Sequence, residues 1–283
     1  MSVRGRVWLV TGAGRGLGRA FAEAAISAGD TVIATARTAE ALLGLEEAYG
    51  GAVLPIVLDV TDRAAVRAAV TSAIDCLGRI DVLVNNAGYG LAGAVEELDE
   101  LRLRRQFDVN FFGVVWCTQA VLPYMCKQGS GHIFQISSVG GVIALPYVGG
   151  YNASKWAVEG LSDSLAQEVG QFGIRVTIVE LGPFRSDWNG SSLDHAEPLP
   201  AYDDIMATRR EQLSGAHAFT QQGDPARAAQ ALLSVLESNQ PPLRLLLGRS
   251  AADIAPEVYR GRLAEWERWD DVARGADFDT DSS

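Results

Sequence analysis

The chain has 283 residues, of which 48% are hydrophobic and 21% charged, and its formal net charge is -11. This composition is typical of a globular protein whose length suits one α/β domain with a large core. The negative charge argues against a nucleic-acid partner, because phosphate backbones are bound by basic surfaces.

The N-terminal residues begin an apolar strand pattern at once, and no apolar run reaches the length of a membrane span. The three cysteines, Cys76, Cys117 and Cys126, show no C-x-x-C spacing, which favours reduced thiols. The three histidines show no ligand spacing, so no metal site is expected. The sequence therefore predicts a cytoplasmic protein with no membrane or metal partner.

Short apolar runs alternate with amphipathic segments along the chain. The runs expected as strands are residues 6–11, 31–35, 52–60, 80–86, 131–138, 174–180 and 242–248. The segments expected as helices include residues 17–28, 62–77, 106–127, 151–172 and 225–238. Several runs are continuously apolar, as strands buried on both faces must be. The pattern predicts an α/β fold, a doubly wound Rossmann-like parallel sheet of about seven strands, with a ligand crevice beyond the carboxyl ends of the strands.

One domain is expected to span residues 1–268. Within it, residues 185–222 are polar and dotted with Gly, Pro and Ser, and an insertion of that length is typical of a lid over a substrate. Residues 269–283 carry five aspartates and one arginine, which predicts a solvated, disordered tail.

A glycine-rich turn, TGAGRGLG, lies at residues 11–18 between the first expected strand and helix. Its glycines let the backbone turn sharply and approach a pyrophosphate, which the N–H groups at the helix start then attract. The spacing is G-x-x-x-G-x-G rather than the generic G-x-G-x-x-G. The residues of the turn that we expect to contact a dinucleotide are Thr11, Gly12, Arg15, Gly16, Leu17 and Gly18.

The end of the second expected strand indicates which nucleotide binds. A carboxylate there would hold the ribose hydroxyls and repel a 2′-phosphate. Ala36 supplies no carboxylate, and Arg37 together with Arg15 could hold a phosphate bidentately. These residues favour NADP(H) over NAD(H).

Tyr151 and Lys155 are four positions apart in an expected helix and therefore share one of its faces. A phenol has an ordinary pKa of about 10, so it is a poor base near neutrality. A nearby ammonium group and the positive charge of an oxidised nicotinamide would lower that pKa. In isolation, such a pair is more typical of a solvated helix surface.

In their order and spacing, these features resemble the short-chain dehydrogenase/reductase superfamily over residues 6–186, with weaker similarity to about residue 250. The motifs that carry the resemblance are TGAGRGLG (11–18), LDVTD (58–62), NNAG (85–88), Asn110, Ser138, YNASK (151–155) and LGPFRS (181–186). The resemblance implies an NADP(H)-dependent enzyme that interconverts a ketone or aldehyde and an alcohol.

The resemblance also implies the roles of four catalytic residues. Tyr151 would be the general acid in reduction and the general base in oxidation. Lys155 would reach the nicotinamide ribose and lower the pKa of the phenol, and Ser138 would hold the substrate oxygen. Asn110 would interrupt its helix and hold a water of a proton relay. Ser137 is the rival of Ser138, because alternation along a strand points one of the two away from the crevice.

Other cofactor contacts follow from the resemblance alone. They are Asp59, Val60, Asn86, Ala87, Gly88, Gly182 and Ser186, in addition to Tyr151 and Lys155. Two positions depart from the family pattern: Leu181 stands in place of a proline, and Gln135 in place of a common asparagine.

Two other functions fit this sequence less well than a reductase does. A catalytically idle, NADP-sensing regulator would keep the glycine turn but tends to lose the tyrosine or the lysine. A sugar-nucleotide epimerase or dehydratase usually has a longer C-terminal substrate domain. The substrate stays open among steroid-like, polyketide-like and simple aromatic carbonyl compounds. Family members commonly pair through the helices equivalent to 106–127 and 151–172, which implies a homodimer or homotetramer.

Overall fold

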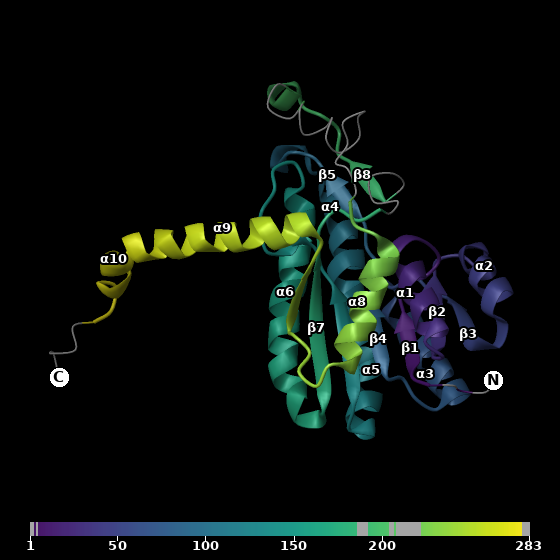
Figure 1. The fold of residues 1–283 in the computed structure, drawn as a ribbon. Coiled ribbons are helices and arrows are strands. Elements are labelled where there is room, and N and C mark those ends of the chain that lie inside the picture. The colour runs from purple at the N-terminus through teal and green to yellow at the C-terminus, as the bar shows by residue number, and fades with distance from the viewer. Residues whose placement is uncertain (1–2, 4, 186–191, 204–206, 208–221, 279–283) are drawn as a thin grey trace.

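Seven parallel strands form the central sheet of the molecule (Figure 1). The structure is a computed structural model and describes residues 3, 5–185, 192–203, 207 and 222–278. The strands of this sheet are β1 (Val7–Val10), β2 (Thr31–Ala36), β3 (Val53–Val57), β4 (Val82–Asn85), β6 (Gly131–Ile136), β7 (Ile174–Leu181) and β9 (Arg244–Leu247). Their order is β3-β2-β1-β4-β6-β7-β9. This arrangement confirms the predicted doubly wound parallel sheet, and each strand lies within or next to an expected run.

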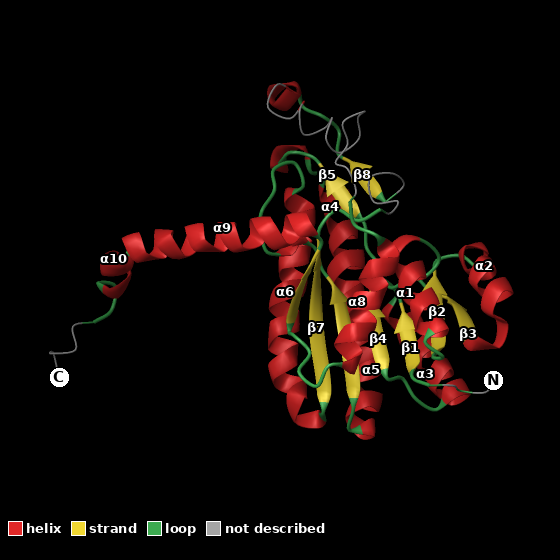
Figure 2. Ribbon diagram, in the orientation of Figure 1, coloured by secondary structure: helices red, strands yellow, loops and turns green. Residues whose placement is uncertain are grey.

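Helices cover both faces of the sheet (Figure 2). The α-helices are α1 (Gly16–Ser27), α2 (Glu40–Tyr49), α3 (Arg63–Leu77), α4 (Glu100–Phe107), α5 (Gly113–Gln128), α6 (Gly149–Val169), α8 (Pro225–Glu237), α9 (Arg249–Arg268) and α10 (Asp270–Arg274). The short 3₁₀ turns are η1 (Gly50–Ala52), η2 (Val95–Glu97), η4 (Val139–Gly141), η5 (Gly170–Phe172) and η7 (Pro200–Tyr202), and η3 (Asp108–Phe112) is a π-helical turn.

The central strand β1 shows why the strand runs are continuously apolar. Trp8 and Val10 point to a core formed with α1, α2 and α8, whereas Val7 and Leu9 point to a second core formed with α3, α5 and α6. All four side chains are buried, so both sides of the strand lie in protein. The strand order reverses between β1 and β4, and in such folds the ligand crevice lies at that point.

The helix expected over 106–127 is longer and less regular than predicted. It begins at Glu100, because the side chain of Asp99 accepts a hydrogen bond from the backbone N–H of Arg102 and caps the start. Residues Glu100–Gln128 are also long and apolar enough for a membrane span by length and composition, contrary to the expectation that no run is. A core helix meets the same criterion, and α5 contributes buried side chains to the second core.

The C-terminal region and the expected lid differ from the sequence expectations. Residues 269–283 were expected to be disordered, but α10 forms at Asp270–Arg274, where the two residues make an i,i+4 ion pair. Most of the expected lid at 185–222 lies outside the described residues. Its described part includes a short strand, β8 (Leu193–His195), paired with β5 (Gly90–Ala92), and this pair was not predicted.

Candidate active site

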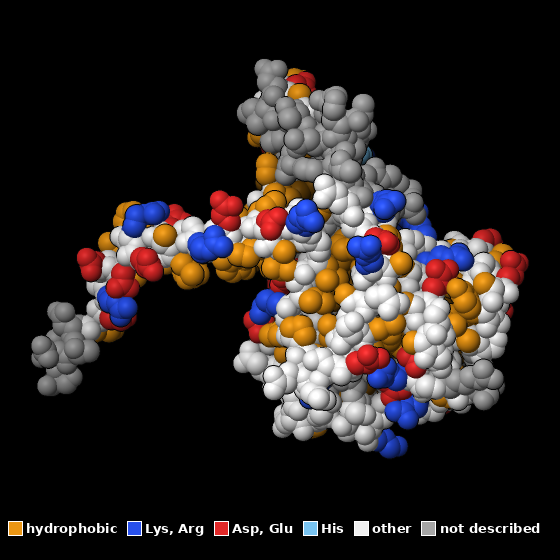
Figure 3. Space-filling view, viewed as in Figure 1, with side chains coloured by type: hydrophobic (Ala, Val, Ile, Leu, Met, Phe, Trp, Pro, Cys, Tyr) orange, Lys and Arg blue, Asp and Glu red, His pale blue; other side chains and the backbone are white. Residues whose placement is uncertain are grey.

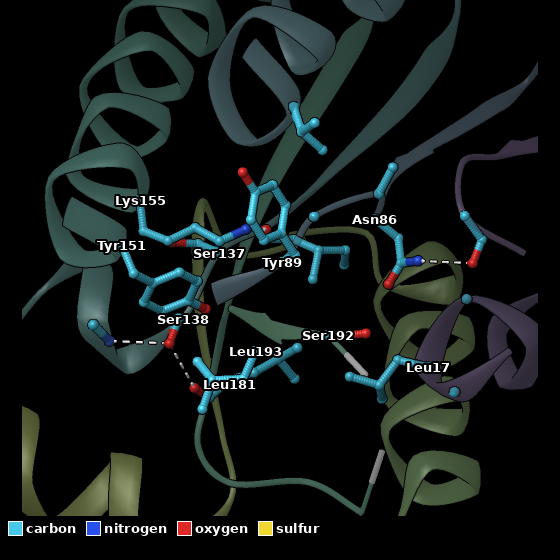
Figure 4. Close-up of a pocket in the computed structure, with 18 of the residues that line it drawn as sticks. Leu17, Asn86, Tyr89, Ser137, Ser138, Tyr151, Lys155, Leu181, Ser192 and Leu193 are labelled. Atoms are coloured by element: carbon cyan, nitrogen blue, oxygen red, sulfur yellow. Dashed lines mark hydrogen bonds between the residues drawn. The ribbon is translucent and has the colours of Figure 1, made fainter. Parts of the chain in front are cut away.

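A cavity of about 1120 Å³ lies at the carboxyl ends of the central strands. Its walls come from the segments that follow β1, β2, β3, β4, β6 and β7, together with the start of α6 and the first turns of α9. Figure 4 shows Tyr151, Lys155 and Ser138 on one side of the cavity, with Leu17 and Asn86 on the other. Residues far apart in the sequence therefore meet where the strand order predicts a ligand.

The glycine-rich turn forms one end of the cavity, and its glycines are required by geometry. Gly12 and Gly16 have backbone φ angles of +67° and +55°, which residues other than glycine rarely adopt. A Cβ at Gly18 would lie 2.2 Å from the carbonyl oxygen of Gly12. No side chain caps the start of α1 after Arg15, so its first N–H groups suit an anion. This cradle fits the pyrophosphate of a dinucleotide.

The segment after β4 ties the glycine turn to the sheet. The hydroxyl of Thr11 accepts hydrogen bonds from the backbone N–H groups of Asn86 (2.9 Å) and Ala87 (3.0 Å). The side-chain amide of Asn86 donates to the carbonyl oxygens of Thr11 (2.9 Å) and Gly12 (3.3 Å). These bonds fix the turn against the end of β4. Gly88 lines the cavity beside them.

Gln135 now has a structural explanation. Its side-chain oxygen accepts a 2.9 Å hydrogen bond from the side-chain amide of Asn85, and its own amide donates to the hydroxyl of Thr118 at 3.3 Å. Asn85 also donates to Thr118 at 3.0 Å. All three side chains are buried, so the glutamine links β4, β6 and α5 below the cavity.

The residues expected at the adenosine end also line the cavity. Arg37 and Asp59 are exposed there, and Val60 lies beside them. Asp59 accepts hydrogen bonds from the backbone N–H and the hydroxyl of Thr61, which hold its carboxylate in place. Arg15 reaches across the cavity and donates a 2.8 Å hydrogen bond to the hydroxyl of Ser192.

The Ser138 and Tyr151 hydroxyls are hydrogen-bonded to each other inside the cavity. The Ser138 hydroxyl also accepts a hydrogen bond from the backbone N–H of Gly140 at 3.1 Å and lies 3.5 Å from the carbonyl oxygen of Leu181. The η4 turn after β6 holds Ser138, and the first turn of α6 holds Tyr151. The two hydroxyls are thus placed to bind one substrate oxygen together.

The neighbouring Ser137 also lines the cavity, but its hydroxyl is bound to another residue. Its hydroxyl donates a 2.6 Å hydrogen bond to the buried carboxylate of Glu159 on α6. Alternation at the end of β6 turns the two serines in different directions. The structure thus gives Ser138, rather than its rival, the position beside Tyr151.

Lys155 lies one helical turn after Tyr151, and its ammonium group donates a 2.8 Å hydrogen bond to the carbonyl oxygen of Ile136. The ammonium nitrogen is 5.9 Å from the centre of the Tyr151 ring. Burial lowers the pKa of Lys155 to about 8, although the nearby carboxylate of Glu159 raises it in part. The lysine is held in place by the backbone of β6.

The pKa of Tyr151 differs from the sequence expectation. Burial raises the pKa of its phenol to about 12, and the hydrogen bond with Ser138 opposes this only in part. Removing the phenol from water disfavours its charged form, and Lys155 is not among the groups that shift this pKa. At neutral pH this tyrosine therefore carries its proton.

Asn110 lies in the π-helical turn η3, where the sequence predicted a local interruption of the helix. Its side chain accepts a 3.0 Å hydrogen bond from the backbone N–H of Tyr89 and donates a 2.9 Å bond to the carbonyl oxygen of the same residue. It also donates to the hydroxyl of Ser154 at 3.1 Å. The asparagine thus locks the segment after β4 onto α6, beside Lys155.

The segment after β7 closes another wall of the cavity. Leu181 is the last residue of β7 and pairs in register with Leu247, and a proline there would lack the N–H that a central strand uses. Gly182 lines the cavity and donates its N–H to the carbonyl oxygen of Leu247 at 2.8 Å. Ser186, which was expected to contact the cofactor, lies outside the described residues.

Several residues that line the cavity were missed in the sequence. They are Tyr89, Leu145, Pro146, Val148, Asp194, Ser250 and Ile254. Leu193, an apolar residue of the expected lid, lines the cavity as well. Tyr89 directly follows the NNAG motif, so its position could have been inferred from that motif. The others come from loops, from β8 and from α9, whose positions depend on tertiary packing. Among the described residues, no group of three or more His, Cys, Asp or Glu side chains could hold a metal ion.

Comparisons with known proteins agree with this geometry. A model of the short chain dehydrogenase family matches residues 6–197. Oxidoreductase BOA17 of Botryotinia fuckeliana is 43% identical over 272 residues, which cover 95% of this chain and 98% of that protein. A 3-ketodihydrosphingosine reductase of Bacteroides thetaiotaomicron is 37% identical over 252 residues, covering 86% of this chain and 88% of that protein.

Solved structures show the same similarity. A crystal structure of a short-chain dehydrogenase from Streptomyces avermitilis superposes with a TM-score of 0.90 at 44% identity, covering 96% of this chain and all of that one. A Burkholderia phymatum enzyme in complex with NAD gives 0.75 at 26% identity, covering 87% and 90%. A metagenomic oxidoreductase in complex with NADP gives 0.70 at 28%, covering 87% and 98%. The chain therefore belongs to the short chain dehydrogenase family of oxidoreductases.

Proposed function

We propose that this protein is an NADP(H)-dependent oxidoreductase that interconverts a ketone or aldehyde and an alcohol, with Tyr151 as the residue that transfers the proton. The observation that carries the proposal is the pair of hydroxyls of Ser138 and Tyr151, hydrogen-bonded to each other in the same cavity as a glycine cradle. A site for a nucleotide and a site for a carbonyl oxygen thus share one cavity.

The chain's own residues suit a nicotinamide dinucleotide. The glycine turn would hold the pyrophosphate, Asp59 and Val60 would lie against the adenine, and Lys155 would reach the nicotinamide ribose. The segment 86–88 and Gly182 line the cavity between these ends. When bound, the cofactor supplies or accepts the hydride.

Two arginines support NADP(H) as the cofactor. Arg15 and Arg37 both line the cavity at the end where Ala36 closes β2, and neither Ala36 nor Arg37 provides a carboxylate for the ribose hydroxyls. A 2′-phosphate would be attracted by both guanidinium groups. An Ala36→Asp variant should reverse the preference, because the new carboxylate would repel that phosphate. The ratio of the two dissociation constants, for NADPH and for NADH, measures the effect, and tighter binding of NADH by the unaltered protein would contradict the proposal.

The protonated phenol of Tyr151 supports reduction of a carbonyl compound as the reaction at neutral pH. The high pKa of Tyr151 keeps its proton on the phenol, from which it can pass to the carbonyl oxygen of a substrate. Ser138 holds the same oxygen in line with the phenol. Asn110 and Lys155 would complete the route by which Tyr151 regains a proton from solvent.

The lining of the cavity supports a bulky, apolar carbonyl substrate. Beyond Tyr151, the side chains in the cavity are mainly aliphatic; they include Ile143, Leu145, Pro146, Val148, Leu193 and Ile254. Leu193 belongs to the part of the expected lid, 185–222, that the structure describes, which supports a substrate-covering role for that segment. A relative that is a 3-ketodihydrosphingosine reductase is consistent with a substrate that has a long apolar chain.

We also propose that the protein works in the cytoplasm as a homodimer or homotetramer.

The test is consumption of NADPH with a panel of apolar ketones and aldehydes of increasing chain length. Tyr151→Phe removes only the hydroxyl and should lower kcat at least a hundredfold, since general acid catalysis contributes about 10²–10⁴-fold. Tyr124→Phe is the matched control, because this tyrosine packs in the second core outside the cavity. Equal rates for Tyr151→Phe and the unaltered protein would refute the role of Tyr151. Binding of NADPH without turnover of any compound would instead favour the NADP-sensing regulator.

A further inference from the structure

The first part of the helix α9, residues 249–262, packs on the body of the protein, and we call this part its root. Ala255 lies in a small apolar cluster with Val142 and Ile143. Arg262 donates a 3.0 Å hydrogen bond to the carbonyl oxygen of Val142, and its guanidinium carbon lies 4.9 Å from the centre of the Trp156 ring. These contacts hold the first half of the helix against the region of α6 and η4.

Beyond Arg262 the chain leaves the body. Figure 1 shows α9 continuing as a straight helix into solvent, with α10 at its far end. We call residues 263–278 the arm. Every residue of the arm is exposed except Asp270, which is half-buried. Within the described chain, the arm therefore has very little protein packed against it.

The arm nevertheless carries large apolar side chains. Leu263, Trp266, Trp269 and Val272 are 52%, 68%, 61% and 65% exposed. Leu263, Trp266 and Trp269 are spaced three residues apart and so lie toward one side of α9, whose C-cap residue is Trp269, and Val272 follows in α10. We call these four side chains the stripe. Figure 3 shows apolar side chains on the surface of α9, among its charged side chains. A tryptophan buries about 150–250 Å² when it is covered, so the stripe offers a substantial contact area.

A free helix with this composition lacks what usually stabilises helices. Most helical stability in proteins comes from packing of an apolar face, and isolated helices of this length are marginal in water. An exposed apolar stripe rimmed by charges is typical of an interaction surface. The arm is thus expected to be covered by a partner.

The distribution of charge along α9 indicates which partner. Residues 249–262 hold three arginines against two acidic residues, whereas the arm holds five acidic residues against two arginines. Two copies of the helix placed antiparallel would set the acidic arm of each near the basic half of the other, as a two-fold interface requires. An anionic lipid surface or a nucleic acid would be repelled by the acidic arm.

We propose that the arm binds a second copy of this chain, with its helix antiparallel to that copy's α9. The surface is separate from the helices 106–127 and 151–172 through which pairing was expected, apart from Trp156 at the root. It also bears on the active site, because the first turns of the same helix bring Ser250 and Ile254 into the cavity. The second copy would brace that wall from outside.

The test compares the mass of the full-length protein in sedimentation equilibrium with that of Trp266→Glu/Trp269→Glu. We expect the mass of the assembly to fall by half in this variant. Ala264→Glu is the matched control, because it adds a negative charge to the polar face of the same arm and should leave the mass unchanged. Far-ultraviolet circular dichroism checks that the variants keep their helices.

Three results would overturn the proposal. The first is an unaltered protein that sediments as a monomer at micromolar concentration. The second is a Trp266→Glu/Trp269→Glu assembly of unchanged mass, above all if Phe112→Glu, on the surface of α5 and η3, does break the assembly. The third is co-sedimentation of the unaltered protein with phosphatidylcholine/phosphatidylglycerol vesicles that the double variant abolishes, since the stripe would then serve a membrane.

Discussion

Ser137 and Glu159 are joined by a buried 2.6 Å hydrogen bond, in which the hydroxyl at the end of β6 donates to the carboxylate on α6. Glu159 lies four residues after Lys155 and so shares its helix face. The other carboxylate oxygen of Glu159 is 3.6 Å from the guanidinium group of Arg244, which is itself half-exposed and pairs with Asp163 at 2.9 Å. Lys155 is thus backed by a buried carboxyl group that is hydrogen-bonded to Ser137.

This hydrogen-bonded pair predicts that Glu159→Gln shifts the pH dependence of kcat/KM. The carboxylate raises the pKa of Lys155, whereas burial lowers it to about 8. Without the negative charge the pKa of Lys155 should fall further, so the lysine loses its proton at lower pH. The alkaline limb of kcat/KM should therefore move to lower pH.

Asp163→Asn is the control for this shift. It removes a carboxylate that also pairs with Arg244, but this side chain is 44% exposed and should leave the limb in place. A uniform loss of kcat/KM at all pH values in Glu159→Gln would show that the glutamate only supports the fold.

A second buried carboxylate, Glu180 on β7, predicts a pH-dependent cost to folding. Its side chain is 4% exposed, and burial together with the negative charge of Glu159 raises its pKa to about 7, although Arg244 opposes the shift. The folded protein thus holds this proton more tightly than the unfolded chain does. Stability should therefore fall as pH rises from the ordinary pKa near 4.5 to about 7, and stay lower above it.

Glu180→Gln removes this cost. We expect the variant to gain at most about 3 kcal/mol in the free energy of unfolding at about pH 8 and nothing at about pH 4. Urea unfolding at the two pH values measures the difference. Glu168→Gln, on the exposed face of α6, is the control. A gain of the same size at both pH values would show that ionisation of Glu180 is not its cause.

Gly18 tests the cofactor cradle. A Cβ at this position would lie 2.2 Å from the carbonyl oxygen of Gly12 and 2.4 Å from the amide nitrogen of Asn86, so Gly18→Ala must displace the turn. Affinity for NADPH should fall by at least about tenfold, which is about 1.4 kcal/mol. Isothermal titration calorimetry provides the constants.

The matched control is Gly160→Ala, inside α6. Nothing lies within 4 Å of a Cβ there, so the substitution should leave NADPH binding unchanged and stabilise the helix by about 0.5–1 kcal/mol. Equal affinities of the Gly18→Ala and unaltered proteins would mean that the turn does not contact the nucleotide.

The features that the sequence predicts well are those with a local physical cause. The strand runs are recognisable because both faces of strands such as β1 are buried, and the spacing of Tyr151 and Lys155 follows from helical periodicity. The choice between Ser137 and Ser138 could not be made from residues alone, because it depends on which side of β6 meets the cavity. The resemblance to a family favoured Ser138, and its contact with Tyr151 agrees.

The features that the sequence did not predict depend on packing between distant segments. The pKa of Tyr151 is set by burial, which the spacing to Lys155 does not reveal. Ile254 reaches the cavity only because α9 crosses over η4, and the pairing of β5 with β8 joins segments about a hundred residues apart. No local pattern encodes such contacts.

The hydroxyl of Tyr89 gives a last prediction, about substrate binding. The backbone of Tyr89 is fixed by Asn110, and its side chain lines the cavity, yet its buried hydroxyl has no hydrogen-bond partner among the described residues. A buried polar group without a partner costs free energy, so Tyr89→Phe should leave the stability unchanged or raise it by about 1 kcal/mol. If the Tyr89 hydroxyl binds the substrate, KM of the Tyr89→Phe variant for the carbonyl compound should rise about five- to tenfold while kcat changes little, since one hydrogen bond contributes about 1 kcal/mol. Steady-state kinetics with the best compound of the panel measure both constants, and unchanged values of KM and kcat would exclude Tyr89 from substrate recognition.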